Sequence, residues 1–408
     1  MRAIKALTFF MFMMFAMTTD SVGIIIPEII KSFHLSLTAA GAFQYATMSG
    51  IAVAGFLLGH LADRLGRKPT IIAGLSVFAG TSYLFIAGSS FVYFCVLMAL
   101  SGAAIGIFKT GALALIGDIS KSTVEHTSIM NTVEGFFGIG SIIGPAILAN
   151  LLSRGISWQW LYVLAGSVCV LLIITAARVH YPVHRPTAAT EGADMKVLLD
   201  IAKNRFVLAF SFGAFLYVAV ESAIYVWMPT LLAGYRGRAA WIAAYSISIF
   251  FLLRAAGRFL GAWMVNYLHW TTVLAVSSGM IFLCFVVGIA AGPEWAVFCF
   301  PLSGLFMSVI YPTINSKGIS CLPKSEHGAG AGVILFFTCV SAVLAPLAMG
   351  AVSDALGSPR YGFLLATGFA AFLFTGLLLN CIFNPTVRVF EHADMAEYNA
   401  LTPAPPTV

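Results

Sequence analysis

Residues 59–68 read GHLADRLGRK and join two apolar stretches, 38–62 and 69–88. Each stretch is long enough to cross a bilayer, because a spanning helix takes about 20 residues. The joining segment holds one acid, three Lys or Arg side chains and two glycines. Lys and Arg concentrate in the short cytoplasmic loops of membrane proteins. The segment therefore predicts a tight cytoplasmic loop between two membrane-spanning helices.

The composition of the whole chain agrees with this interpretation. Of 408 residues, 60% are hydrophobic and 9% are Asp, Glu, Lys or Arg, against about 25% charged residues in soluble domains. An ordinary soluble fold is excluded. The net charge of +6 does not indicate a nucleic-acid partner, because the cations fall between apolar stretches rather than on one soluble face. Seven cysteines are scattered without C-x-x-C spacing, so we predict neither a metal site nor a cofactor.

The hydropathy pattern predicts an all-α integral membrane protein with twelve transmembrane helices. The predicted spans are 6–30, 38–62, 69–88, 91–117, 127–152, 158–178, 206–232, 239–265, 271–291, 295–316, 328–352 and 361–383. The first span runs through Asp20 to Pro27 without a cleavage site of small residues, so we expect it to be retained rather than removed as a signal peptide.

The loops predict the orientation of the chain in the membrane. Of 22 Lys and Arg residues, fourteen fall on the side of the N-terminus and five on the opposite side. The positive-inside rule then places both termini in the cytoplasm, and we expect a monomer in the plasma (inner) membrane. The predicted organisation is an N-terminal six-helix half at 1–178, a cytoplasmic linker at 179–205, a C-terminal six-helix half at 206–383 and a disordered cytoplasmic tail at 384–408.

The two halves repeat one another. An offset of 202 residues places Pro27 on Pro229 and Leu58-Gly59 on Leu260-Gly261, and an offset of 201 places Glu125-His126 on Glu326-His327. Two similar six-helix halves in the same orientation are the parallel repeat of major facilitator transporters, which bind substrate near the bilayer midplane between the halves.

The loop at 59–68 resembles the signature loop of the major facilitator superfamily, and the likeness extends over nearly the whole chain. It implies two pseudo-symmetric halves that work by alternating access. Two glycines allow close packing and a tight turn, while the acid and its neighbouring cations clamp helices in one conformation. The gating residues implied in this way are Gly59, Asp63, Arg64, Gly66 and Arg67. The counterpart at 261–270 lacks the acid, so we expect the stronger clamp in the first half.

Three shorter segments, 133–140, 214–221 and 257–261, resemble the fucose, galactose and glucose proton-symporter family, particularly its glucose/mannose-type members. The activity implied by this resemblance is sugar uptake driven by protons. The chain departs from the family at two positions. Lys109 stands where these members usually carry Glu, and Asp20 lies about one turn before the position at which fucose-type members carry an acid.

Three acids inside predicted spans are candidates for proton coupling. Ionisable residues at membrane depth are costly and mark ion or substrate pathways. We rank Glu221 first because it lies near the middle of the seventh span, and Asp20 next because the repeat places it at the same depth in the other half. The third candidate is Glu134.

Three cations lie inside the spans with these acids. Lys109 and Glu134 are predicted at similar depth, so Lys109 is either a structural partner of Glu134 or a ligand of the substrate. Arg254 is predicted to be a charge partner or substrate ligand. Arg258 is close to a membrane face, where we expect its long side chain to extend toward water.

Polar and aromatic side chains within spans supply candidates for hydrogen bonding and stacking on a sugar ring. The predicted lining residues are Gln44, Asn131, Tyr217, Tyr225, Tyr311 and Asn315. No catalytic motif of an enzyme appears, and the predicted partners are a small solute and protons. The first interpretation is import of a hexose-like sugar. A carrier of an organic or sugar-acid anion remains open because of Lys109 and Arg254, and a drug or metabolite exporter because of a partial fifth-helix motif at 140–145.

Overall fold

The computed structural model describes residues 2–35, 39, 42–182, 195–232 and 235–398. The first half contains α1 (Arg2–Thr19), α2 (Val22–Phe33), α4 (Ala42–Leu58), α5 (Leu61–Arg64), α6 (Arg67–Leu84), α7 (Phe91–Ile119), α8 (Thr123–Ser153) and α9 (Gln159–Arg178). The second half contains α11 (Arg205–Ser222), η2 (Ala223–Trp227), α12 (Met228–Leu232), α13 (Ala240–Ala244), α14 (Ser246–Met264), α15 (Trp270–Ala290), α16 (Pro293–Met307), α17 (Ile310–Ser320), η3 (Lys324–Glu326), α18 (His327–Leu356) and α19 (Pro359–Phe383).

The prediction of an all-helical fold with twelve spans is confirmed. Within the described residues, ten helical segments are long and apolar enough to cross a membrane, and α4 and α6 occupy the two remaining predicted spans. Helix starts follow local side-chain chemistry. Ser90, Ser122 and Asn204 accept hydrogen bonds from backbone N–H groups in the first turns of α7, α8 and α11. The turn predicted at Gly66 has φ +92°, a conformation that favours glycine.

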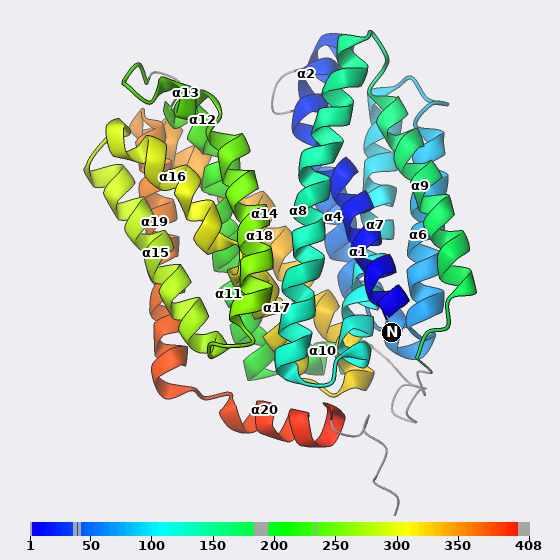
Figure 1. Ribbon diagram of the computed structural model, residues 1–408. Coiled ribbons are helices and arrows are strands. Elements are labelled where there is room, and N and C mark those ends of the chain that lie inside the picture. Colours follow the sequence, from blue (N-terminus) through cyan, green and yellow to red (C-terminus); the bar gives the residue numbers. More distant parts are fainter. Residues whose placement is uncertain (1, 36–38, 40–41, 183–194, 233–234, 399–408) are drawn as a thin grey trace, which may run out of the picture.

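The two halves are packed most closely at the end of the bundle that carries Asp63, which we call the Asp63 end (Figure 1). There α4 and α18 meet backbone to backbone. A methyl group added to Gly332 would collide with the carbonyl oxygen of Gly55, and one added to Gly328 would collide with that of Gly59. Small residues let helix backbones approach in a membrane, where packing replaces the hydrophobic effect as the driving force. In Figure 1 the two groups of helices diverge toward the opposite end.

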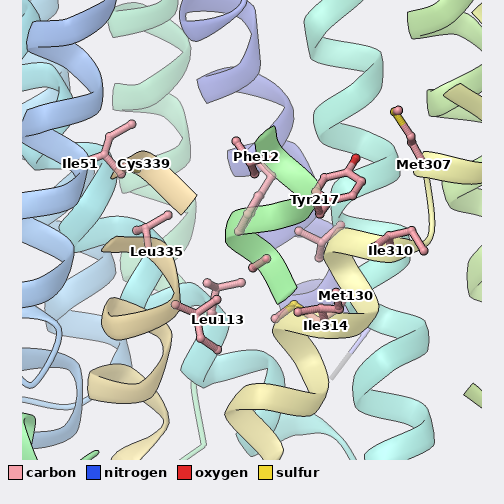
Figure 2. Close-up of a cluster of buried hydrophobic side chains, with 14 of the residues drawn as sticks. Phe12, Ile51, Leu113, Met130, Tyr217, Met307, Ile310, Ile314, Leu335 and Cys339 are labelled. Atoms are coloured by element: carbon pink, nitrogen blue, oxygen red, sulfur yellow. The ribbon is translucent and has the colours of Figure 1, made fainter. Parts of the chain in front are cut away.

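A buried apolar cluster continues this interface toward the middle of the bundle. Figure 2 shows Phe12 and Met130 of the first half beside Tyr217 and Ile314 of the second. Dispersion contacts in such a cluster are lost if the halves separate at this level.

The structure corrects the expectation of a disordered tail. Residues 387–398 form α20 (Val387–Ala393) and η4 (Asp394–Tyr398), which lie across the Asp63 end in Figure 1. Phe390 and Tyr398 are buried against the bundle, so this segment gains enough apolar contact to offset its ordering entropy. Part of the predicted linker also forms a helix, α10 (Met195–Lys203). Residues 183–194 and 399–408 lie outside the described residues.

Candidate transport site

The first helix of each half is interrupted at the same position of the repeat. Between α1 and α2, Asp20 and Ser21 form a turn. In the second half, the α-helical hydrogen bonding of α11 ends at Ser222 and changes to the π-helix η2 at Ala223. The offset of 202 residues relates these two interruptions. Broken helices near the midplane are typical of transporter binding sites, and π-helical turns concentrate at functional sites.

An ion pair lies beside the interruption in the second half. The Glu221 Oε1 atom is 2.6 Å from Arg254 Nη1 and accepts a hydrogen bond of 2.6 Å from the Tyr217 hydroxyl. All three side chains are buried. Because both charges belong to the second half, the pair joins α11 to α14 and leaves Glu221 fully engaged in this conformation.

The acid at the interruption in the first half has a different environment. The Asp20 carboxylate accepts a hydrogen bond from the Ser141 hydroxyl of α8. Among the described residues no cation lies within 4.0 Å of it. Arg254, Arg258 and Lys109 are within electrostatic reach of Asp20. The charges of both halves therefore converge on this level of the bundle.

The second buried ion pair crosses between the halves. Arg258 Nη2 lies 3.2 Å from Glu134 Oε2, and Arg258 Nη1 donates a 2.7 Å hydrogen bond to the Glu134 carbonyl oxygen. This corrects two expectations, because Glu134 pairs with Arg258 rather than with Lys109, and Arg258 is only 3% exposed instead of extending toward water. Gly135 and Gly138 bring α8 close to α14, which places the two charges together.

Lys109 is the cation left without such a partner. Its Nζ atom lies 5.0 Å from the centroid of the Phe137 ring and 6.0 Å from that of Phe12. In the part of the chain that the structure describes, no carboxylate lies within 4.0 Å of Nζ, and the side chain is half-buried. The thiol of Cys339, on α18 of the other half, is within electrostatic reach. The ammonium therefore lies where the two halves meet.

The predicted lining residues separate into three places. Tyr217 and Tyr311 stack with ring centroids 6.1 Å apart, and Tyr225 is half-buried within electrostatic reach of Glu221. Asn131 and Asn315 are buried nearer the Asp63 end, where Asn131 donates a 3.3 Å hydrogen bond to Thr313 Oγ1 across the halves. Gln44 is half-buried on α4 beside Phe43, in an apolar cluster of the first half. The tyrosines are thus the predicted residues that the structure brings to the charged level.

The gating residues form a connection between the halves. Asp63 accepts hydrogen bonds from the backbone N–H groups of Gly328 (3.0 Å) and Ala329 (2.8 Å) at the start of α18, and it lies 2.5 Å from Arg67 Nη1. Arg67 also donates to Asp118 at 2.7 Å and to the carbonyl oxygen of Lys324 at 2.5 Å. An anion at a helix N-terminus is favoured by the exposed N–H groups and the helix dipole. Arg64, by contrast, is exposed.

Two histidines at the Asp63 end were not predicted to have a role. His126 and His327 are fully buried, and their rings stack across the halves with centroids 5.9 Å apart. His126 Nδ1 is 2.8 Å from Ser320 Oγ. The Glu-His pair that recurs in both halves was a signal for these positions, but the repeat alone does not say that the two copies meet.

Comparison with known proteins identifies the family of the chain. The model of the Major Facilitator Superfamily matches residues 8–346. A "Glucose/galactose transporter" of Brucella abortus is 26% identical over 374 residues, which cover 87% of this chain and 88% of the relative. "Protein TsgA" of Escherichia coli O157:H7 is 24% identical over 379 residues, covering 90% and 93%.

Solved structures of transporters have the same fold. The E. coli fucose:proton symporter FucP superposes with a TM-score of 0.78 at 22% identity, covering 92% of this chain and 98% of that one. The proton:xylose symporter XylE superposes with a TM-score of 0.73 at 11% identity, covering 94% and 95%. The family match, the twelve spans and the two related halves establish a multi-pass membrane transporter rather than an enzyme, and the chain belongs to the major facilitator superfamily.

Proposed function

We propose that this chain is a proton-coupled secondary transporter that imports a hexose-like sugar by alternating access. The observation that carries the proposal is the pair of interrupted helices with an acid at each interruption, Asp20 and Glu221. The positive-inside pattern places the Asp63 end and both termini in the cytoplasm. On that orientation the conformation described here is closed toward the cytoplasm, and the protein works as a monomer in the inner membrane.

The partners of the two acids favour Asp20 as the proton carrier. Protonating Glu221 in this conformation would leave the buried guanidinium of Arg254 uncompensated, at a cost of several kcal/mol. Asp20 is held by a hydroxyl group and has no ion pair among the described residues, so it can accept a proton without leaving such a charge. We therefore rank Asp20 ahead of Glu221 as the proton carrier, which reverses the order favoured by depth alone. The Glu221–Arg254 pair would then respond to the change of charge when Asp20 is protonated.

Aromatic rings near these charges support a sugar as the solute. The rings of Tyr217 and Tyr311 stack on each other, and the rings of Phe12 and Phe137 lie beside Lys109. Rings with polar groups close by suit a pyranose, which has apolar faces and a rim of hydroxyl groups. The names of two similar proteins, the glucose/galactose transporter and the fucose:proton symporter, point the same way.

The exporter alternative gains no support from the fifth-helix glycines. Gly140 and Gly144 each pack against the backbone of α1, at Met13 and Met17. Close packing of helices within one half accounts for both glycines without reference to the direction of transport.

The proposal is tested in proteoliposomes containing the purified full chain. Sugars are added outside, and a trapped pH dye reports proton entry. We expect the interior to acidify with the transported sugar and with no lipophilic cation. Asp20→Asn should remove this signal while counterflow of the same sugar persists. Proton-driven efflux of lipophilic cations, or sugar counterflow with no proton movement in wild type, would overturn the proposal.

A further inference from the structure

The charges at the middle of the bundle do not all cancel in pairs. Glu221 is matched by Arg254 at 2.6 Å and Glu134 by Arg258 at 3.2 Å. The remaining acid, Asp20, is held by Ser141, and the remaining cation is Lys109. Among the described residues no ion pair joins Asp20 to Lys109, so each can take a different partner during transport.

The surroundings of Lys109 are suited to an anion with an apolar body. Two phenyl rings, Phe12 and Phe137, border the ammonium within the first half, and α18 of the other half lies within electrostatic reach through Cys339. An ammonium at membrane depth without an anion is costly. A carboxylate delivered there would be bound by a charge-assisted hydrogen bond, which is about twice as strong as a neutral one.

We propose that the transported sugar carries a carboxylate, as in hexuronates and aldonates, and that Lys109 binds it. This inference rests on the proposed function and narrows its substrate class. The carboxylate of the sugar forms an ion pair with the Lys109 ammonium, and the sugar ring lies against Phe12 and Phe137. Asp20 carries the proton. One monocarboxylate moving with one proton transfers no net charge, whereas a neutral sugar moving with one proton transfers one positive charge.

The charge carried by each cycle gives a test that needs no mutation. Full-length protein in proteoliposomes is offered D-glucuronate, its uncharged amide D-glucuronamide, and D-glucose. We expect counterflow and proton-coupled uptake of D-glucuronate, with the amide and D-glucose bound about 10–100-fold more weakly because an ion-paired hydrogen bond is lost. A potassium diffusion potential should leave D-glucuronate uptake unchanged, while a pH gradient drives it.

Variants of Lys109 test whether its ammonium causes the preference for D-glucuronate over the amide. Lys109→Gln should lose the preference for D-glucuronate over its amide, and Lys109→Arg should keep most of it. Because the comparison is between two ligands on one protein, it does not depend on expression level. Potential-driven uptake of D-glucose by wild type, or an acid preference that survives in Lys109→Gln, would overturn the inference and leave proton-coupled sugar transport intact. Transport of neither neutral nor acidic sugars would overturn the proposed function together with it.

A second observation, independent of Lys109, concerns the segment 387–398. Asp394 accepts hydrogen bonds from the backbone N–H (2.8 Å) and hydroxyl (3.1 Å) of Thr123, the first residue of α8 in the first half. The Tyr398 hydroxyl lies 3.2 Å from Ser320 Oγ in the second half and 3.2 Å from His126 in the first. Burial raises the pKa of Tyr398, so this hydroxyl stays protonated.

The same segment also covers cations of the second half. Lys317 Nζ lies 4.8 Å from the centroid of the Phe390 ring, and Lys324 Nζ lies 4.3 Å from that of Tyr398. Its contacts therefore span α8 on one side of the Asp63 end and α17 and η3 on the other. These contacts exist together only while the two halves are close at this end.

We infer that residues 387–398 are a latch that stabilises the conformation closed at the Asp63 end. Spin labels at Arg178 and Leu268, exposed at this end in different halves, report its opening in a cysteine-free background. Asp394→Asn combined with Tyr398→Phe should raise the ratio of open to closed protein about tenfold. Glu391→Gln removes an exposed charge from α20 and should change nothing. An unchanged distance distribution in the double variant and in a chain ending at Asn384 would overturn the latch.

Discussion

The Asp63 end and the middle of the bundle both hold buried charges, yet they treat them differently. At the Asp63 end the Asp63 carboxylate is bound by two backbone N–H groups and by Arg67, which itself reaches Asp118. At the middle, Asp20 and Lys109 have no ion partner among the described residues. The Asp63 carboxyl has fixed partners in both halves, so it holds the two halves in one conformation. Charges that have no fixed partner can exchange protons and ligands.

The largest effect is expected at Asp20, because coupling requires a group that changes charge. Asp20→Asn should abolish accumulation of solute against its gradient, with exchange across the membrane retained. Glu221→Gln is the matched variant at the other interruption. We expect it to lower stability and transport rate but to leave solute transport coupled to proton flux. Accumulation and proton flux are measured together in proteoliposomes. If Glu221→Gln uncouples and Asp20→Asn does not, the proton belongs to Glu221.

The next effect is expected at the ion pair that joins the two halves, Glu134 with Arg258. Glu134→Gln or Arg258→Gln alone leaves an uncompensated buried charge, at a cost of about 3–5 kcal/mol. The double variant should recover much of the melting temperature of the detergent-solubilised protein. Combining Glu134→Gln with Lys109→Gln should give no such recovery. Recovery in that second combination would restore Lys109 as the structural partner of Glu134.

A smaller effect is expected from Asp63→Asn. The amide keeps one acceptor oxygen but loses the charge, so the closed conformation should lose about 1.5–3 kcal/mol, the worth of hydrogen bonds to a charged group. The labels at Arg178 and Leu268 should report more open protein, while the affinity of the outward-facing protein for substrate stays unchanged. Equal losses of binding and interconversion would show that Asp63 is not specific to gating.

The smallest effect is expected at a neutral contact of the Asp63 end. Thr127 Oγ1 lies 3.0 Å from Ser316 Oγ across the halves. Thr127→Val keeps the shape of the side chain and removes this contact together with the hydrogen bond of the same hydroxyl to the Thr123 carbonyl oxygen in its own helix. Only the contact with Ser316 depends on the closed conformation, which should therefore lose about 1 kcal/mol. The same label distances measure this change. A shift as large as that of Asp63→Asn would contradict the distinction between charged and neutral contacts drawn here.

The sequence by itself determined the fold. Apolar stretches of spanning length, cations between them and a repeat with an offset of 202 residues were sufficient to predict twelve helices in two halves. These signals are local or periodic, and lipid leaves a helix as the main way to satisfy the backbone. The sequence also indicated which charged residues lie at membrane depth, and it marked the loop at 59–68 for gating.

The pairing of those charges was decided only by the tertiary structure. Depth along the chain favoured Lys109 as the partner of Glu134, but depth does not say which face of a helix a side chain occupies or which helix it meets. The close approach of α8 to α14 brings Glu134 to Arg258, and Lys109 is left beside the rings of Phe12 and Phe137. The tail likewise reads as polar and Pro-rich, whereas its helix is held by contacts with residues more than 200 positions away. Partners of this kind come from distant segments, and only packing brings them together.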